Sequence, residues 1–290
     1  MIHNLLLAAL TIGTVLFAVA LFQAWRRAPV SPSPEGVAMS AVSNFFDTLG
    51  ISSFASTTAY LKFRKLVPDE LIPCTMMVGY GLPATTQAFI FLNVVKIDPL
   101  LLGLGIAASV VGGLVGVSVA AWLPVRPIRL VMGIGLLIAA ASFAASALGL
   151  MPPGGTATSL PLIPFLIVVA ASFFLGVLVN LGVGNFAPTL VLVSLLGMDP
   201  RAAFPLMMGS AALLVLVAGV RIIRARPLNM ALVLGMILGG IPAVLVAAFI
   251  VKSLPIEQLR WGVIAVVTYA AAVMLHAAAA PPPRAAAEPA

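Results

Sequence analysis

Charged residues, histidine and cysteine are all scarce in this chain of 290 residues. Only 8% of its residues are charged, whereas a soluble domain carries about a quarter. The single cysteine, Cys74, excludes a disulfide within the chain, and the two histidines, His3 and His276, lie near opposite ends of it. No Cys or His cluster with metal-ligand spacing remains. We therefore expect no metal site and no cofactor.

The same scarcity argues against enzymes that work inside membranes. A serine protease needs a Ser–His dyad, which two distant histidines do not supply. An aspartyl protease needs two carboxylates within the membrane, and Asp47 is the single candidate. Haem and metal redox carriers need His, Cys or Met ligands in helical register. The chain also has no phosphate-binding loop for ATP. We expect no enzymatic activity.

Hydrophobic residues, by contrast, make up 62% of the chain and fall in long unbroken runs. Residues 100–125 and 228–251 contain no charge, and each run exceeds the roughly 20 apolar residues that cross a bilayer as a helix. A transmembrane β-barrel would show alternating apolar and polar residues instead. The sequence predicts an all-α polytopic membrane protein. Its net charge of +7 lies in short loops, where it sets topology, so we expect no nucleic-acid partner.

The two ends of the chain lie outside the main pattern. Residues 2–24 are apolar and are followed by Arg26 and Arg27, whereas a signal peptide carries its positive charge before the apolar stretch. Residues 1–27 are therefore predicted to be an extra transmembrane helix, joined to the rest by a linker rich in Ser and Pro. Residues 278–290, with three consecutive prolines, predict a disordered tail.

The remaining chain predicts two groups that each contain one interrupted segment and three spans. The first repeat, residues 36–150, comprises an interrupted segment at 36–63 and spans at 71–95, 100–123 and 128–150. The second repeat, residues 161–277, comprises an interrupted segment at 162–196 and spans at 202–220, 228–251 and 256–277. Small-residue spacings that permit close helix packing occur at Gly112-x-x-x-Gly116 and Gly235-x-x-x-Gly239.

Internal similarity links the two groups. Residues 49–57 can be aligned with residues 181–189, with five of the nine positions identical, at an offset of 132 (181 − 49). The same offset aligns Pro73 with Pro205, each after a short charged loop. We interpret the two groups as a repeat.

Charge distribution predicts how the repeat is oriented. If each interrupted segment is a hairpin that returns to its starting side, three crossings separate the two hairpins, and the second copy is inverted. The basic residues then divide 11 against 4 between the two sides, whereas crossing segments would divide them 7 against 8. The positive-inside rule therefore favours returning hairpins, an outer N-terminus and a cytoplasmic C-terminus. The eleven are Arg26, Arg27, Lys62, Arg64, Lys65, Arg126, Arg129, Arg221, Arg224, Arg226 and Arg284.

Interrupted helices at matching positions of two inverted halves indicate a transport site near the bilayer midplane. The half-helix that starts after each break presents unpaired N–H groups and partial positive charge, which suit an anion. Gly50 and Gly182 allow the chain to turn there. The alternative is that the polar residues only cap broken helices in a lipid environment. The candidate substrate-binding residues are Ser52, Ser53, Ser56, Thr57, Asn180, Gly184, Asn185 and Thr189.

Asp47 lies inside the first apolar hairpin. A carboxylate at the bilayer centre costs about 2.5–3.5 kcal/mol on insertion scales, which marks it as a functional candidate. It could bind a coupling proton, help to bind a cation such as Na⁺, or hold the hairpin turn. The aligned position in the second half is Val179, so any such role is confined to one half. Thr48 and Gln87 are further candidates for lining a cavity.

The motif Phe45-Phe46-Asp47-Thr48-Leu49-Gly50, the broken segments and the two-half organisation resemble the TauE/SafE family of sulfite and organosulfonate exporters. The resemblance covers residues 36–277. It implies export of small sulfur-containing anions across a bacterial inner membrane. Many members carry a Gly-rich cluster at each break, whereas this chain has Ser52-Ser53 and Gly184-Asn185. The more polar lining leaves the particular anion open.

The sequence thus predicts a secondary transporter that exports small anions by alternating access, with proton coupling as a hypothesis. The alternatives are an uncoupled anion channel, a non-transporting membrane scaffold and a cation carrier. The expected partners are the small anion and the lipid bilayer. The sequence leaves the coupling ion and the existence of a homo-oligomer open.

Overall fold

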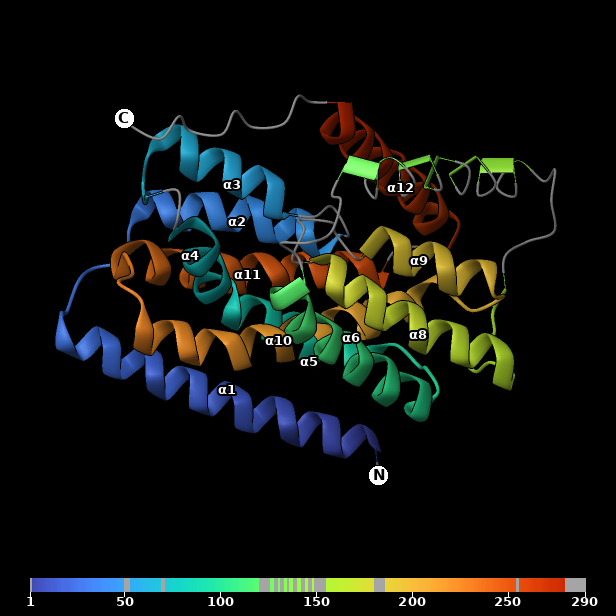
Figure 1. Ribbon diagram of the computed structural model, residues 1–290, viewed down its shortest axis with the longest axis horizontal. Helices are drawn as coiled ribbons and strands as arrows, with labels where there is room; N and C mark the ends of the chain where they lie inside the picture. Colours follow the sequence, from blue (N-terminus) through green and yellow to red (C-terminus); the bar gives the residue numbers. More distant parts are fainter. Residues whose placement is uncertain are drawn as a thin grey trace.

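The computed structural model is built from helices (Figure 1). It describes residues 2–49, 53–68, 71–119, 155–179, 186–253 and 256–279, and twelve residues between 126 and 148. Within these ranges the one β interaction is an isolated parallel bridge between Ala157 and Met198. The predicted tail, residues 278–290, lies outside the described residues apart from its first two, which extend the last helix.

The structure describes the bounds of eleven α-helices and one short 3₁₀ helix. They are α1 (Ile2–Arg27), α2 (Pro34–Thr48), α3 (Ser53–Arg64), α4 (Ile72–Gly79), α5 (Gly81–Val94), α6 (Pro99–Val119), α8 (Leu162–Val179), α9 (Phe186–Leu195), the short 3₁₀ helix η3 (Pro200–Ala202), α10 (Ala203–Ala225), α11 (Met230–Ser253) and α12 (Ile256–Ala279). Eleven of the twelve described residues between 126 and 148 are helical.

Four helices of the described part are long and apolar enough to cross a membrane: α1, α6, α11, and α10 together with η3. Large apolar side chains remain exposed on them, including Leu5, Ile12 and Leu16 along one face of α1. Such faces suit hydrocarbon rather than water. The chain is therefore an all-α membrane protein, which confirms the class predicted from composition.

Each predicted interruption coincides with a boundary between two helices that form a hairpin. In the first hairpin, Glu35 at the start of α2 contacts Arg64 at the end of α3. In the second, Ala157 precedes α8 and pairs with Met198 after α9. The open ends of the two hairpins lie at opposite ends of the long axis, so both hairpins extend toward the middle of the molecule (Figure 1).

The predicted span at residues 71–95 is not one continuous helix. It divides at Tyr80 into α4 and α5. Pro83 has no backbone N–H, so it cannot donate to the carbonyl of Gly79 four residues earlier, and the helical hydrogen-bond pattern is interrupted there. The corresponding segment of the second half, α10, is continuous and extends to Ala225, five residues beyond the predicted end.

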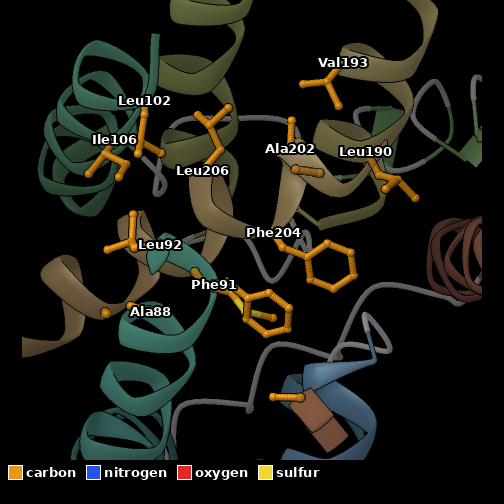
Figure 2. Packing of buried hydrophobic residues seen from close by; sticks show 14 of the residues in the cluster. Ala88, Phe91, Leu92, Leu102, Ile106, Leu190, Val193, Ala202, Phe204 and Leu206 are labelled. Atoms are coloured by element: carbon orange, nitrogen blue, oxygen red, sulfur yellow. The ribbon is translucent and has the colours of Figure 1, made fainter. Parts of the chain in front are cut away.

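The main apolar core lies between α5, α6, α9 and α10 (Figure 2). Phe91 of α5 stacks on Phe204 of α10 with ring centroids 4.9 Å apart. Phe17 of α1 is fully buried in the same core. A second, smaller cluster lies where α2, α3, α4 and α11 meet, and its buried members are Met39, Leu61, Val67, Ile72, Met76, Tyr80, Leu232 and Met236.

The most extensive helix contacts join α2 with α11 and α6 with α8. Glycines allow both contacts, because a Cβ at Gly239 would lie 2.0 Å from the Val37 carbonyl oxygen and a Cβ at Gly112 would lie 2.0 Å from the Phe173 carbonyl oxygen. Both glycines belong to the predicted small-residue spacings. α3 and α9 begin 133 residues apart (186 − 53), and α6 and α11 begin 131 residues apart (230 − 99). These separations are close to the sequence offset of 132.

Candidate functional site

Asp47 lies in the last turn of α2, beside the start of α3. Its Oδ1 accepts the backbone N–H of Ser53 at 3.1 Å and the Ser53 hydroxyl at 3.0 Å. Its Oδ2 accepts the side-chain amide of Gln87 at 3.3 Å. A carboxylate at a helix N-terminus satisfies an unpaired N–H and favourably meets the positive end of the helix dipole. Asp47 thus caps α3 and links the hairpin to α5.

A ladder of buried polar side chains continues from this point along α2. Gln87 Nε2 also donates to the Thr48 hydroxyl at 2.8 Å, and that hydroxyl donates to the carbonyl of Asn44 at 2.7 Å. The Asn44 amide donates to the Ser40 hydroxyl at 2.9 Å, which donates to the Met236 carbonyl of α11 at 2.6 Å. Every group in the ladder has a partner, as burial requires. The ladder fixes α2 to α11.

A second polar group lies about one helical turn from Asp47, between α2 and α3. The Thr57 hydroxyl donates to the Ser43 hydroxyl at 3.1 Å and is also hydrogen-bonded to the Tyr80 hydroxyl. Because a threonine hydroxyl carries one hydrogen and Ser43 receives it, Tyr80 is the donor to Thr57. Tyr80 lies at the boundary of α4 and α5, so this hydrogen bond joins the first hairpin to that boundary.

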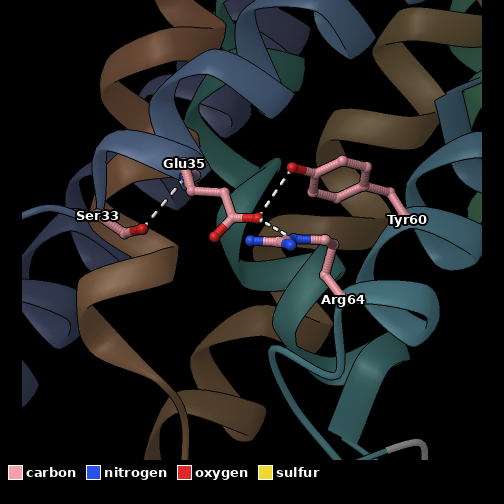
Figure 3. Close-up of polar contacts among 5 residues, drawn as sticks. Ser33, Glu35, Tyr60 and Arg64 are labelled. Atoms are coloured by element: carbon pink, nitrogen blue, oxygen red, sulfur yellow. Dashed lines mark hydrogen bonds and ion pairs between the residues drawn. The ribbon is translucent and has the colours of Figure 1, made fainter.

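The open end of the first hairpin carries a third polar group (Figure 3). Glu35 Oε1 accepts Arg64 Nε at 2.7 Å and the Tyr60 hydroxyl at 2.9 Å. These hydrogen bonds, first from Arg64 and then from Tyr60, lower the pKa of the Glu35 carboxyl. The carboxylate therefore holds the two helices together at neutral pH. Ser33 caps α2 beside it by accepting the N–H of Gly36 at 3.2 Å.

The structure brings together the first-hairpin candidates that it describes, and the candidates from both hairpins are described only in part. Two adjoining polar groups, together called the polar cluster, contain the candidates Asp47, Thr48, Ser53 and Gln87 in one and Thr57 in the other. Thr189 is buried on α9, and none of the hydrogen bonds that join this cluster reaches it. The candidates outside the described residues are Ser52, Asn180, Gly184 and Asn185, together with the side chain of Ser56.

Sequence reasoning missed four members of the cluster: Ser40, Ser43, Asn44 and Tyr80. Three of them carry a signal that the sequence contains. Polar residues recur every four positions at 40, 44 and 48, and again at 43 and 47, which places them on adjoining faces of one helix. Tyr80 has no such signal, because its contact with Thr57 spans 23 residues.

The polar cluster has no equivalent at the aligned positions of the second half. At the offset of 132, Ser43 aligns with Leu175, Asp47 with Val179 and Tyr80 with Ala212. Leu175 and Ala212 are both buried. In the part of the chain that the structure describes, no three His, Cys, Asp or Glu residues lie together as a metal site would need. Of the aligned positions compared, only those of the first half carry ionisable groups, Asp47 and Tyr80.

Comparisons of this chain with protein-family models, with curated proteins and with solved structures find no match.

Proposed function

We propose that this protein is a secondary transporter of small anions, which exports sulfite or organosulfonates by alternating access around a site between its two hairpins. The observation that carries the proposal is the pair of hairpins that extend toward the middle from opposite ends of a membrane protein (Figure 1). Broken helices arranged in this way are a common architecture for substrate sites near the midplane.

Reciprocal packing supports an inverted repeat. At the offset of 132, α2 aligns with α8 and α11 aligns with α6. The contact of α2 with α11 therefore has the contact of α8 with α6 as its equivalent, and these two are the most extensive in the described structure. Exchanging the halves converts one interface into the other, as a pseudo-two-fold axis in the membrane plane requires.

The distribution of basic residues supports the orientation. The C-terminal ends of α1, α3 and α10 lie at the same end of the molecule (Figure 1). They carry Arg26, Arg27, Lys62, Arg64 and Arg224 in their last turns. By the positive-inside rule this end faces the cytoplasm of a bacterial inner membrane, with the N-terminus outside.

Asp47 suggests how protons and anions are coupled. Its carboxylate binds the Ser53 N–H, the kind of donor that an anion at the start of α3 would use. Protonation removes the negative charge and weakens that hydrogen bond, which leaves the donor available to substrate. Anion binding then requires a protonated Asp47, so the proton and the anion move in the same direction. Export by this route requires an outward anion gradient that exceeds the inward proton gradient.

Flux measurements in proteoliposomes test this proposal. The purified protein is reconstituted, and a panel of sulfite, sulfonates and carboxylates is followed with imposed pH gradients of either sign. Saturable anion movement against its own gradient, driven by the pH gradient, is the expected result. Strictly downhill flux would indicate a channel instead of a transporter. Flux that requires Na⁺ would indicate a cation-linked carrier. The absence of flux for every anion tested would indicate a non-transporting scaffold.

A further inference from the structure

We propose that α3 is the moving gate of the first hairpin: it separates from α2 along a polar interface and opens a water-accessible path from the basic end of the molecule to Asp47. The inference rests on the proposed function, because a gate has meaning only where a solute passes. It identifies which helix moves, from which side the site is reached and which side chains line the opening.

The interface between α2 and α3 has four levels at intervals of about one turn, and three of them are polar. The innermost joins Asp47 with Ser53 at 3.0 Å, and the next joins Ser43 with Thr57 at 3.1 Å. The third level is apolar and belongs to the small cluster that contains Met39 and Leu61. The outermost is the group of Glu35 with Tyr60 and Arg64 (Figure 3).

Polar interfaces between helices separate where water can replace their hydrogen bonds, and lipid cannot do so. Separation of α3 from α2 would leave the hydroxyls of Ser43, Thr57 and Tyr80 without their present partners. Water entering from the open end of the hairpin would satisfy them. The same hydroxyls would then form the polar wall of the path, with Asp47 at its inner end.

The packing of α2 shows why α3 is the helix that moves. α2 is held against α11 by close backbone contact at Gly235 and Gly239 and by the buried hydrogen bond from Ser40 to Met236. The main contacts of α3 are instead with α2 and α4. Among the α3 side chains that the structure describes, Leu61 belongs to the small apolar cluster and none belongs to the main core. α2 is thus part of the fixed body, and α3 is attached to its edge.

The second hairpin is fastened differently at its open end. The Ala157 N–H donates to the Gly197 carbonyl at 3.3 Å, and the Asp199 N–H donates to the Ala157 carbonyl at 3.0 Å. The segment before α8 is also tied to α6, because the Asp98 N–H donates to the Thr158 carbonyl at 2.8 Å. These are backbone contacts, whereas the first hairpin is closed by exposed side chains. Among the described residues, backbone hydrogen bonds therefore close the open end of the second hairpin, whereas side-chain contacts that water can replace close that of the first.

Thiol accessibility tests the gate without measuring transport. Cys74 is replaced by Ala, and Thr57→Cys is introduced as the single reactive site. A membrane-impermeant thiol reagent is then applied to inside-out and right-side-out vesicles. Labelling of Thr57→Cys from the cytoplasmic face alone is expected. Adding Arg64→Gln should accelerate labelling by up to about fivefold, the effect of an exposed ion pair on an opening equilibrium.

Matched variants keep the test decisive. Arg226→Gln removes an exposed arginine beyond the end of α10 and should leave the labelling rate unchanged. Ser43→Cys provides a second reporter on the facing helix in case Thr57→Cys does not fold. Thr189→Cys, on α9, should not be labelled from the cytoplasmic face. If neither Thr57→Cys nor Ser43→Cys reacts from that face with Arg64→Gln present, α3 is not the gate.

Labelling and flux together separate this inference from the proposed function. Labelling from the cytoplasmic face with no anion flux would support movement of α3 and contradict the proposal that the protein is a transporter. Anion flux with no labelling of either cysteine variant would support the proposed transporter and contradict movement of α3. Labelling from the outer face would contradict the proposed side of access.

Discussion

The Asp47 carboxylate accepts the backbone N–H of Ser53 at 3.1 Å, so an anion of the chain itself binds the first amide of α3. The sequence pointed to this helix start as a place for a transported anion. A carboxylate and a substrate anion cannot occupy the same donor together, since both are negative and both need its hydrogen. In the proposed transporter, Asp47 is therefore the residue through which pH controls anion binding.

Replacing Asp47 by asparagine should remove the pH dependence of transport. The amide cannot titrate, while asparagine caps a helix about as well as aspartate, so the hairpin should still fold. Flux of a sulfonate, which stays anionic throughout the pH range, is the measurement. Asp98→Asn is the control, because Asp98 caps α6 by accepting the N–H groups of Leu100 and Leu101. If the pH profile of Asp47→Asn matches that of the wild type, Asp47 does not couple protons to transport.

The Glu35 group should make stability depend on pH in the acid range. Hydrogen bonds from Arg64 and Tyr60 lower the pKa of Glu35 below its ordinary value of 4.5. A carboxyl with a lowered folded-state pKa contributes stability that is present above the unfolded pKa and lost as pH falls through the folded pKa. The difference in thermal midpoint between wild type and Glu35→Gln should therefore be present at pH 7 and vanish in acid. A difference that stays constant down to pH 3 would contradict this assignment.

The two reciprocal interfaces should respond alike to added methyl groups. Gly112→Ala and Gly239→Ala each place a Cβ 2.0 Å from a backbone oxygen of the facing helix, which cannot move without separating the helices. Each should cost about 1–3 kcal/mol, as overpacking usually does. Thermal unfolding in detergent measures the effect. Gly13→Ala is the control, because its Cβ would meet side-chain atoms of Leu216 rather than backbone, the nearest being Cδ1 at 3.1 Å. A mild effect at one of the two interfaces only would count against their equivalence.

Phe17 should prove energetically coupled to Gly219. The Phe17 ring lies where a Cβ at Gly81 or Gly219 would come within 2.4 and 2.5 Å of it. Phe17→Ala should cost about 3 kcal/mol. Gly219→Ala should be harmful with the ring present and much less so without it, so the double variant should depart from additivity by on the order of 1 kcal/mol. Gly262→Ala, with nothing within 4 Å of its Cβ, is the neutral control. Additive effects would mean that α1 does not fill this space.

Hydropathy predicts the long apolar helices, because a bilayer span leaves a long uncharged run in the sequence. The start of α6 at Pro99 and of α8 at Leu162 fell within one residue of prediction. The division at Tyr80 was missed although Pro83 marks it, since proline is also tolerated inside membrane helices. Apolar runs indicate that a helix is present, but they do not show where its backbone hydrogen bonding is interrupted.

The site was less accessible to sequence reasoning for a physical reason. Asp47 stood out because a charge in an apolar segment is costly, and Ser53 was a candidate because it follows the break. Their mutual hydrogen bond could not be read, since it depends on how the turn folds back. The contact of Gln87 with Asp47 spans 40 residues and depends on the packing of α5 against the hairpin. Such contacts leave no periodic signal in one sequence.

In the proposed transporter, a small anion binds between the starts of α3 and α9. The most direct test is a structure determined with a bromine-labelled sulfonate, whose anomalous signal or density locates the anion. Bound anion is expected at the midplane, within hydrogen-bonding distance of the first residues of both helices. Anion bound elsewhere, or two helix starts that lie far apart and face lipid, would contradict it.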